Sequence, residues 1–204
     1  MSVVTQTSKP SRKTSGKMKK RQDEFVSLDG LLTVEQWAAL PEVKPPYELM
    51  RGRLVQKMVT TNEHNWAVGE LLTACKLWAR TSRWRFFSEG SGVAISGRDG
   101  YIPDVMGYAP STALEGKATY NEAPFLVAEV LSASTAHTDR TEKLENYAHI
   151  GVPIYILVDT DARTIEVYHL HSGAYGSPEV WRDNDVWQPA ELPGLRVELA
   201  RLWF

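Results

Sequence analysis

A single glutamate interrupts an otherwise apolar run, FLVAEVL at residues 125–131. Such a run is typical of a central strand covered on both faces, and an ionised carboxylate buried there without a partner is too costly to persist. Glu129 is therefore expected to hold a proton, pair with a cation or bind a metal ion. The alternative is an edge strand that exposes Glu129 to water, but the apolar neighbours argue against it. Because strand residues alternate between faces, we expect Phe125, Val127, Glu129 and Leu131 to share one face.

A second carboxylate, Asp104, directly follows Pro103 and opens the predicted strand Asp104–Tyr108. Proline has no backbone N–H and belongs at the first residue of a strand, which places Asp104 at the edge or mouth of a sheet. On its own, an aspartate after proline is usually a turn or capping residue. Together with Glu129 on a following strand, it suggests two carboxylates that meet across a sheet. Hard oxygen ligands of this kind select Mg²⁺ or Mn²⁺ over zinc.

Lys143 lies on the predicted helix that follows the Glu129 strand. Steps of four and seven residues group it with Tyr147 and Ile150, at the border of the apolar face. A lysine in this position either extends its ammonium to solvent or points toward a local negative cluster. A metal-bound pair of carboxylates would be such a cluster.

Two further candidates each have an ordinary structural alternative. His64, in the first turn of the long predicted helix, shares an inward stripe with Val68 and Cys75. It is either a metal ligand or acid–base group, or a histidine packed beside the core. Glu48, in YELMRGRL, is either a further acidic residue near the metal or part of the polar face of an edge hairpin, and the hairpin interpretation is preferred. Cys75 lies among apolar residues and is expected in the core.

The pattern of apolar residues, turn residues and helix stop signals predicts an α/β protein. Arg51 and Gly52 are expected to join the first two strands as a hairpin, and a turn is expected at Arg98-Asp99-Gly100. Gly151 is expected to end the third helix. The predicted helices are Val34–Leu40, Glu63–Ala79 and Asp139–Ile150, and the predicted strands are Tyr47–Met50, Leu54–Val59, Trp84–Phe87, Val93–Ser96, Tyr101–Tyr108, Phe125–Leu131, Ile154–Val158 and Thr164–Leu170.

Charge is unevenly distributed along the 204 residues, although the formal net charge is only -2. Residues 1–21 contain seven basic and no acidic side chains, whereas residues 22–204 contain 16 basic and 25 acidic ones, a net charge of -9. We expect residues 1–24 to form a disordered basic arm, either a solubilising tail or a contact for phosphates. Residues 25–204 are expected to form a single domain. Its acidity excludes a simple basic module that coats nucleic acid.

Composition excludes further classes of protein. The single cysteine rules out an intramolecular disulfide framework and a multi-cysteine zinc ribbon, and it is compatible with a reducing cytoplasm. The sequence has no run of about 18 apolar residues, which a spanning helix would need. The basic N-terminus lacks the apolar stretch of a secretory signal. We therefore expect a cytoplasmic protein without a membrane partner.

These motifs resemble the Uma2 family, a branch of the PD-(D/E)XK restriction-endonuclease-like superfamily. The resemblance covers about residues 32–170. Each piece is modest, but their order and spacing together are specific. The matching pieces are YELMRGRLV at 47–55, EH at 63–64, PDV at 103–105, VAEVLSAST at 127–135, DRTEKLENYAHIGVPIYILVD at 139–159 and IEVYHL at 165–170.

The resemblance implies a restriction-endonuclease-like mixed central β-sheet flanked by α-helices, with additional antiparallel hairpins. Asp104 matches the PD motif and Glu129 matches the carboxylate of the second motif. The pair would bind Mg²⁺ or Mn²⁺, with a backbone carbonyl near Val130 completing the shell. The chain departs from the superfamily pattern two residues after Glu129, where Leu131 stands in place of lysine. Lys143 on the next helix is the natural substitute.

The implied function is a metal-dependent endonuclease that hydrolyses DNA phosphodiester bonds, so DNA is the expected partner. The acidic body and the missing motif lysine leave a second option, a catalytically inactive DNA- or protein-binding module on the same fold. A nuclease for RNA is a third option, which no aromatic-rich RNA-binding motif supports. A homodimer is compatible with this type of nuclease.

Overall fold

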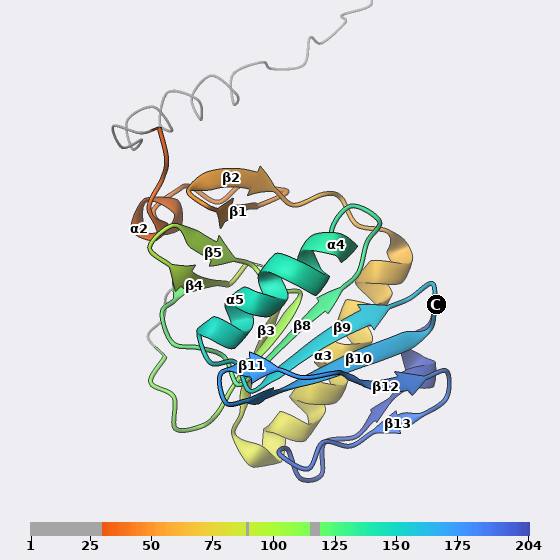
Figure 1. Cartoon of the computed structure of the whole chain (residues 1–204). Coiled ribbons are helices and arrows are strands. Elements are labelled where there is room, and N and C mark those ends of the chain that lie inside the picture. Colours follow the sequence, from red (N-terminus) through yellow and green to blue (C-terminus); the bar gives the residue numbers. More distant parts are fainter. Residues whose placement is uncertain (1–29, 89, 115–118) are drawn as a thin grey trace, which may run out of the picture.

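A large mixed sheet with a helix on each face organises the computed structural model, which describes residues 30–88, 90–114 and 119–204. Among these residues the sheet has seven strands (Figure 1). Helix α3 (Asn62–Ser82) covers one face and α5 (Leu144–His149) covers the other. In order across the sheet the strands are β11 (Ala174–Tyr175), β10 (Thr164–His171), β9 (Ile154–Asp159), β8 (Leu126–Val130), β6 (Val105–Tyr108) and β3 (Arg85–Ser88), and β12 (Glu179–Arg182) also pairs with β10.

Strand β8 is central, as the apolar run predicts. All five of its residues are buried, and it pairs with β6 in antiparallel and with β9 in parallel orientation. A parallel pair needs a crossover connection, which usually contains a helix. Here the crossover consists of α4 (Ala136–Thr138), the π-helical turn η1 (Asp139–Lys143) and α5. Gly151 ends it with a positive φ of 85°, which agrees with the predicted stop signal.

A smaller sheet contains the N-terminal hairpin. Its turn residues Arg51 and Gly52 have φ values of 50° and 76°, as a two-residue turn between right-twisted strands requires, so the predicted hairpin is confirmed. Helix α2 (Val34–Ala38) packs on this sheet through Trp37. The strand order is β2 (Arg53–Gln56), β1 (Tyr47–Met50), β5 (Asp99–Tyr101), β4 (Gly92–Ser96) and β7 (Thr119–Tyr120).

The C-terminal segment closes the α3 side of the large sheet. Trp187 and Leu199 are buried in the same apolar cluster as the inward residues of α3, so this segment seals one end of the core. It consists of β13 (Val186–Trp187), β14 (Val197–Glu198) and the 3-10 turn η2 (Leu199–Arg201).

Three sequence predictions need correction. The continuous strand Tyr101–Tyr108 is two strands in different sheets, because Pro103 lacks the N–H that would continue the ladder. The turn expected at residues 98–100 lies at residues 97–98, since Ser96 pairs directly with Asp99. The predicted strand Leu54–Val59 ends at Gln56, where the chain leaves the sheet.

Phe125 also differs from its predicted position. Val127 and Leu131 belong to the apolar cluster on the α5 side of the sheet, as expected for neighbours of Glu129. Phe125 instead packs against the cluster on the α3 side, because β8 begins only at Leu126 and the alternation does not extend to it. Cys75 is fully buried in the α3-side core, as predicted, and burial raises the pKa of its thiol to about 12.

The predicted basic arm, residues 1–24, and the next five residues lie outside the described residues. Within the described part of the chain, none of the helices combines the length and the apolar character needed to cross a membrane.

Candidate active site

Buried ionisable side chains gather at one place, where the end of β8, the start of β6 and η1 meet hairpin β1–β2. Outside this place no Asp, Glu, His or Lys among the described residues is classed as buried. Burying charge is unfavourable unless the groups are paired, so such a concentration indicates a functional site. The members are Glu48, His64, Asp104, Glu129, Asp139 and Lys143.

Strand register brings the two predicted carboxylates together. Val105 pairs with Ala128 in the antiparallel ladder of β6 and β8, so the next pair in the same register is Asp104 with Glu129. Directly opposed residues of antiparallel strands project from the same face, about 5 Å apart at Cβ. The amide of Val130 donates a hydrogen bond to Asp104 Oδ2 at 2.8 Å, which links the two strands just beyond the ladder.

Asp104 is held by two basic side chains. Lys57 Nζ lies 2.8 Å from Oδ1, and His64 Nε2 lies 3.2 Å from Oδ2. Burial disfavours the ionised form of Asp104, but the charge of Lys57 and the hydrogen bond from His64 outweigh it and hold the pKa below its usual range. Burial likewise disfavours the charged form of Lys57, yet the facing carboxylates Asp104, Glu129 and Glu48 raise its pKa. This half of the site is an ion pair.

The second half is built around Lys143. Its ammonium lies 3.0 Å from Glu129 Oε1, 3.3 Å from Asp139 Oδ1 and 3.4 Å from the Glu48 carboxylate. Tyr147, one helical turn further, donates its hydroxyl to the same Glu129 oxygen at 2.9 Å. Asp139 and Lys143 are the ends of the π-helical turn, a feature common at functional sites.

One lysine cannot neutralise three carboxylates, and the excess negative charge acts on Glu129. Burial raises the pKa of Glu129 to about 8, and Asp104 and Asp139 add to the effect while Lys143 opposes it. Without another cation, Glu129 therefore holds a proton near neutral pH.

This proton predicts a pH dependence of stability in a solution containing a metal chelator. The unfolded chain releases the proton near the ordinary value of 4.5 and the folded chain near 8, so the folded state binds more protons between these values. The free energy of unfolding should then fall as the pH rises from about 5 to 8. Replacing Glu129 with glutamine should flatten this fall, as measured by scanning calorimetry across the range. An equally steep fall in the variant would contradict the assignment of the proton to Glu129.

Most predicted site residues meet here, and one preferred interpretation was wrong. Glu48 is not on the polar face of an edge hairpin, since β1 lies between β2 and β5. Its side chain is buried and accepts a hydrogen bond from the amide of Ile102 at 2.9 Å. His64 contacts Asp104, and its Nδ1 is buried without a hydrogen-bond partner among the described residues. Val130 contacts the site through its amide, which donates to Asp104, rather than through the predicted carbonyl.

Sequence reasoning missed Lys57, Asp139 and the role of Tyr147. Lys57 is 47 residues from Asp104 in the chain and follows a strand with no special motif. Asp139 looked like an ordinary first-turn residue of a helix. The only available signal was the four-residue spacing of Asp139, Lys143 and Tyr147, which places all three on one side of a helix.

The donors present suit a magnesium-like ion. The four buried carboxyl groups of the cluster face only two ammonium groups, those of Lys57 and Lys143. If all four carboxyl groups were ionised, two negative charges would remain uncompensated. No three His, Cys, Asp or Glu side chains form a group that could hold a metal alone, as far as the described residues go. Mg²⁺ keeps several waters and uses only one or two protein carboxylates. Asp104 and Glu129 fit that role.

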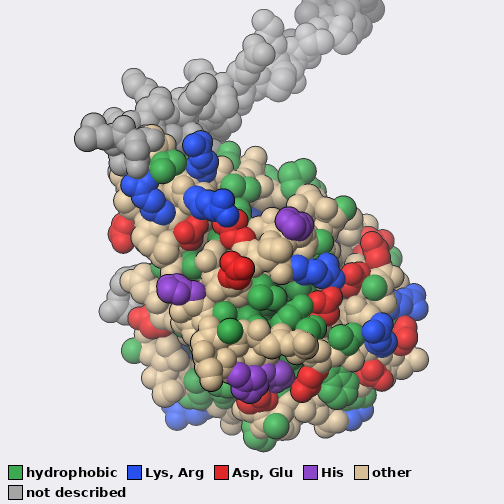
Figure 2. Space-filling model, in the orientation of Figure 1, with side chains coloured by type: hydrophobic (Ala, Val, Ile, Leu, Met, Phe, Trp, Pro, Cys, Tyr) green, Lys and Arg blue, Asp and Glu red, His purple; other side chains and the backbone are tan. Residues whose placement is uncertain are grey.

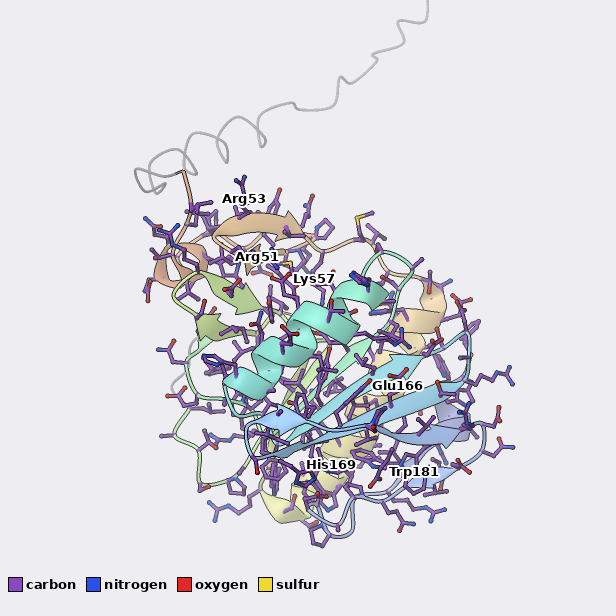
Figure 3. The ribbon with its side chains drawn as sticks, viewed as in Figure 1. Arg51, Arg53, Lys57, Glu166, His169 and Trp181 are labelled. Carbon is purple, nitrogen blue, oxygen red and sulfur yellow. The ribbon has the colours of Figure 1, made fainter. Side chains whose placement is uncertain are left out.

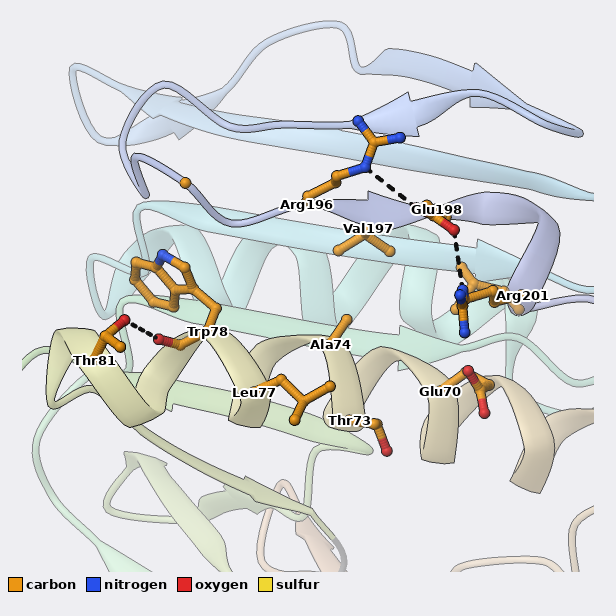
Figure 4. A pocket seen from close by; sticks show the side chains of 12 residues that line it. Glu70, Thr73, Ala74, Leu77, Trp78, Thr81, Arg196, Val197, Glu198 and Arg201 are labelled. Atoms are coloured by element: carbon orange, nitrogen blue, oxygen red, sulfur yellow. Dashed lines mark hydrogen bonds and ion pairs between the residues drawn. The ribbon is translucent and has the colours of Figure 1, made fainter.

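A second concavity on the molecule does not share this chemistry. A cavity of about 480 Å³ lies between α3 and the C-terminal segment, with Leu77 and Trp78 on its helical wall (Figure 4). Three of its four charged residues pair with each other, since Glu198 accepts from Arg196 at 3.3 Å and from Arg201 at 3.0 Å. We therefore place the candidate active site at the buried cluster.

Comparisons with known proteins point to a nuclease family. The family model Uma2, described as "Putative restriction endonuclease", matches residues 34–200. Among solved structures, the chain is similar to a "putative nuclease belonging to DUF820 from Anabaena variabilis ATCC 29413", with a TM-score of 0.71, 20% sequence identity, and coverage of 84% of this chain and 97% of that one. A search of curated proteins finds no significant match. The predicted restriction-endonuclease-like mixed α/β fold is confirmed.

Proposed function

Since the chain belongs to the Uma2 family, we propose that it is a metal-dependent endonuclease that hydrolyses DNA phosphodiester bonds. The observation that carries the proposal is the buried cluster, in which Asp104, just before β6, lies opposite Glu129 of β8 and Lys143 contacts Glu129 at 3.0 Å. Two carboxylates beside a lysine form the set that metal-assisted phosphodiester hydrolysis requires. Lys143 supplies the ammonium that Leu131, at the motif position, lacks.

Asp104 and Glu129 would hold the ion, with Mg²⁺ favoured and Mn²⁺ as the substitute. When bound, such an ion lowers the pKa of a coordinated water and offsets charge on the phosphate. Both carboxylates are oriented by neighbouring groups. His64 and the amide of Val130 hold Asp104, and Tyr147 holds Glu129.

Lys143 would orient the attacking water or stabilise negative charge that develops on the phosphate oxygens. Its position is restricted by three carboxylates on three different elements: Glu48 on β1, Glu129 on β8 and Asp139 on η1. An ammonium held in this way needs little reorganisation when charge develops in the transition state. Asp139 and Glu48 therefore act as positioning residues for Lys143.

The deciding experiment is cleavage of plasmid and of single-stranded DNA in Mg²⁺ or Mn²⁺, with and without EDTA. We expect cleavage that EDTA abolishes and that Asp104→Asn reduces about 10²-fold or more. The control is Glu122→Gln, an exposed carboxylate before β8, which should retain activity. DNA binding without cleavage in either metal would indicate the inactive binding module instead. If the chain cleaves RNA but not DNA, RNA is the substrate instead of DNA.

A further inference from the structure

The hairpin β1–β2 turns one face toward the candidate active site. Glu48 pairs with Val55 and Met50 pairs with Arg53, so these four side chains share a face. The amide of Lys57 donates to the carbonyl of Pro46 at 2.9 Å, which continues the same register by one pair. The face of the hairpin on which Glu48 contacts Lys143 therefore also includes Arg53, Val55 and Lys57.

This outer strand is exposed where the inner one is buried. Strand β2 lies at the edge of its sheet. Val55 on β2 is 43% exposed, and Met58 and Val59, just beyond the end of the strand, are 64% and 86% exposed; they are three of the seven large apolar side chains that are exposed among the described residues. The side chain of Arg53 is exposed and makes no hydrogen bond or ion pair with another described residue. We call Arg53, Val55, Lys57, Met58 and Val59 the β2 strip.

We infer that the β2 strip is the surface along which the DNA strand lies when its scissile phosphate is at Asp104 and Glu129. The inference rests on the proposed function and deepens it by assigning the binding surface. Arg53 contacts a backbone phosphate, and the apolar side chains of Met58 and Val59 contact sugars or bases. Lys57 is the member of the strip that contacts the candidate active site, because its ammonium lies 2.8 Å from Asp104.

Charge favours a polyanion over an apolar protein partner. The described body is acidic, so a phosphate backbone needs a local concentration of cations to approach the carboxylates. Arg53 provides an unpaired cation, and Arg51 at the turn is 79% exposed in a pair with Glu142 that contributes little by itself. Figure 2 shows Lys and Arg side chains at this end of the molecule.

The length of the strip also suits a nucleic-acid strand. Arg53 and Lys57 are four positions apart in an extended chain, a distance of about 13 Å. This corresponds to about four base-pair steps of 3.4 Å along the axis of a DNA duplex. Figure 3 shows Arg53, Arg51 and Lys57 on the hairpin side of the molecule, at the end opposite His169 and Trp181. The strip thus leads from solvent to the cluster.

Fluorescence anisotropy with labelled duplex and single-stranded DNA, in EDTA to prevent turnover, tests the inference on the full chain. We expect Arg53→Ala to weaken binding about fivefold and to reduce the slope of log Kd against log salt concentration by about 0.9 for duplex DNA, the value of one lost phosphate contact. Met58→Ser should weaken binding without changing that slope, because an apolar contact releases no counterions. The matched control is Arg80→Ala, which removes an exposed arginine near the C-terminal end of α3.

The possible failures are distinguishable. If the unaltered chain cleaves DNA but Arg53→Ala and Arg80→Ala bind alike, the inference is wrong and the proposed function stands. If the unaltered chain neither binds nor cleaves DNA, both are wrong. If Arg53→Ala or Met58→Ser leaves DNA binding intact but changes the mass in analytical ultracentrifugation, the strip is an interface between protein chains. Circular dichroism confirms that each variant is folded, and exposure of both side chains makes unfolding unexpected.

Discussion

Replacing Lys143 with methionine is expected to reduce the rate of DNA cleavage about 10²–10³-fold without weakening divalent-ion binding. The ammonium is the cation nearest Glu129, at 3.0 Å, and no other lysine among the described residues contacts that carboxylate. Methionine keeps much of the volume of the side chain but cannot stabilise charge on the phosphate or orient a water. Single-turnover cleavage measures the first effect, and isothermal titration calorimetry with Mg²⁺ measures the second.

In the Lys143→Met variant three buried carboxylates lose their shared ammonium partner, so the stability of the variant must be measured as well. Removing one partner of a buried ion pair costs about 3–5 kcal/mol of folding free energy. The double variant Lys143→Met with Asp139→Asn removes one of the buried negative charges left without Lys143 and should recover part of that stability without recovering cleavage. Lys76→Met, on the exposed side of α3, is the matched control for loss of a lysine. Normal cleavage by a folded Lys143→Met protein would exclude Lys143 from the mechanism.

Replacing Lys57 with methionine is expected to strengthen Mg²⁺ or Mn²⁺ binding about tenfold, the opposite of what loss of a site residue normally does. In the metal-free protein the Lys57 ammonium lies 2.8 Å from Asp104 Oδ1 and competes with the ion for the same carboxylate. A hydrogen bond to a charged group contributes about 1.5–3 kcal/mol, and 1.4 kcal/mol corresponds to tenfold in affinity.

The metal-free variant should be less stable than the unaltered chain, because Asp104 keeps only His64 and the Val130 amide as partners. Added Mn²⁺ should then raise the unfolding temperature of Lys57→Met more than that of the unaltered chain, as measured by calorimetry. Lys57→Arg, which retains the cation, is the control and should bind the ion no more tightly. Weaker metal binding by Lys57→Met would show that the lysine supports the ion rather than opposing it.

The local sequence predicted those features of the fold that depend on a single strand or turn. The apolar run at residues 125–131 predicted a central strand with an anomalous Glu129, and β8 is buried at all five positions. Arg51 and Gly52 predicted the hairpin, and both adopt positive φ. Local patterns did not predict burial that depends on a neighbouring strand. The preferred interpretation of Glu48 as exposed was wrong because β5 covers the other side of β1.

By itself, the sequence determined the elements and the residues able to do chemistry: Asp104, Glu129 and Lys143 on their strands and helix. Only the tertiary structure decided how these charges are compensated. Lys57 reaches Asp104 across 47 residues, and Lys143 meets Glu48 across 95. Such pairings depend on strand register and on how a crossover helix packs over a sheet, which no local periodicity encodes. Because buried charges must be matched wherever the fold brings them together, their partners become visible only in three dimensions.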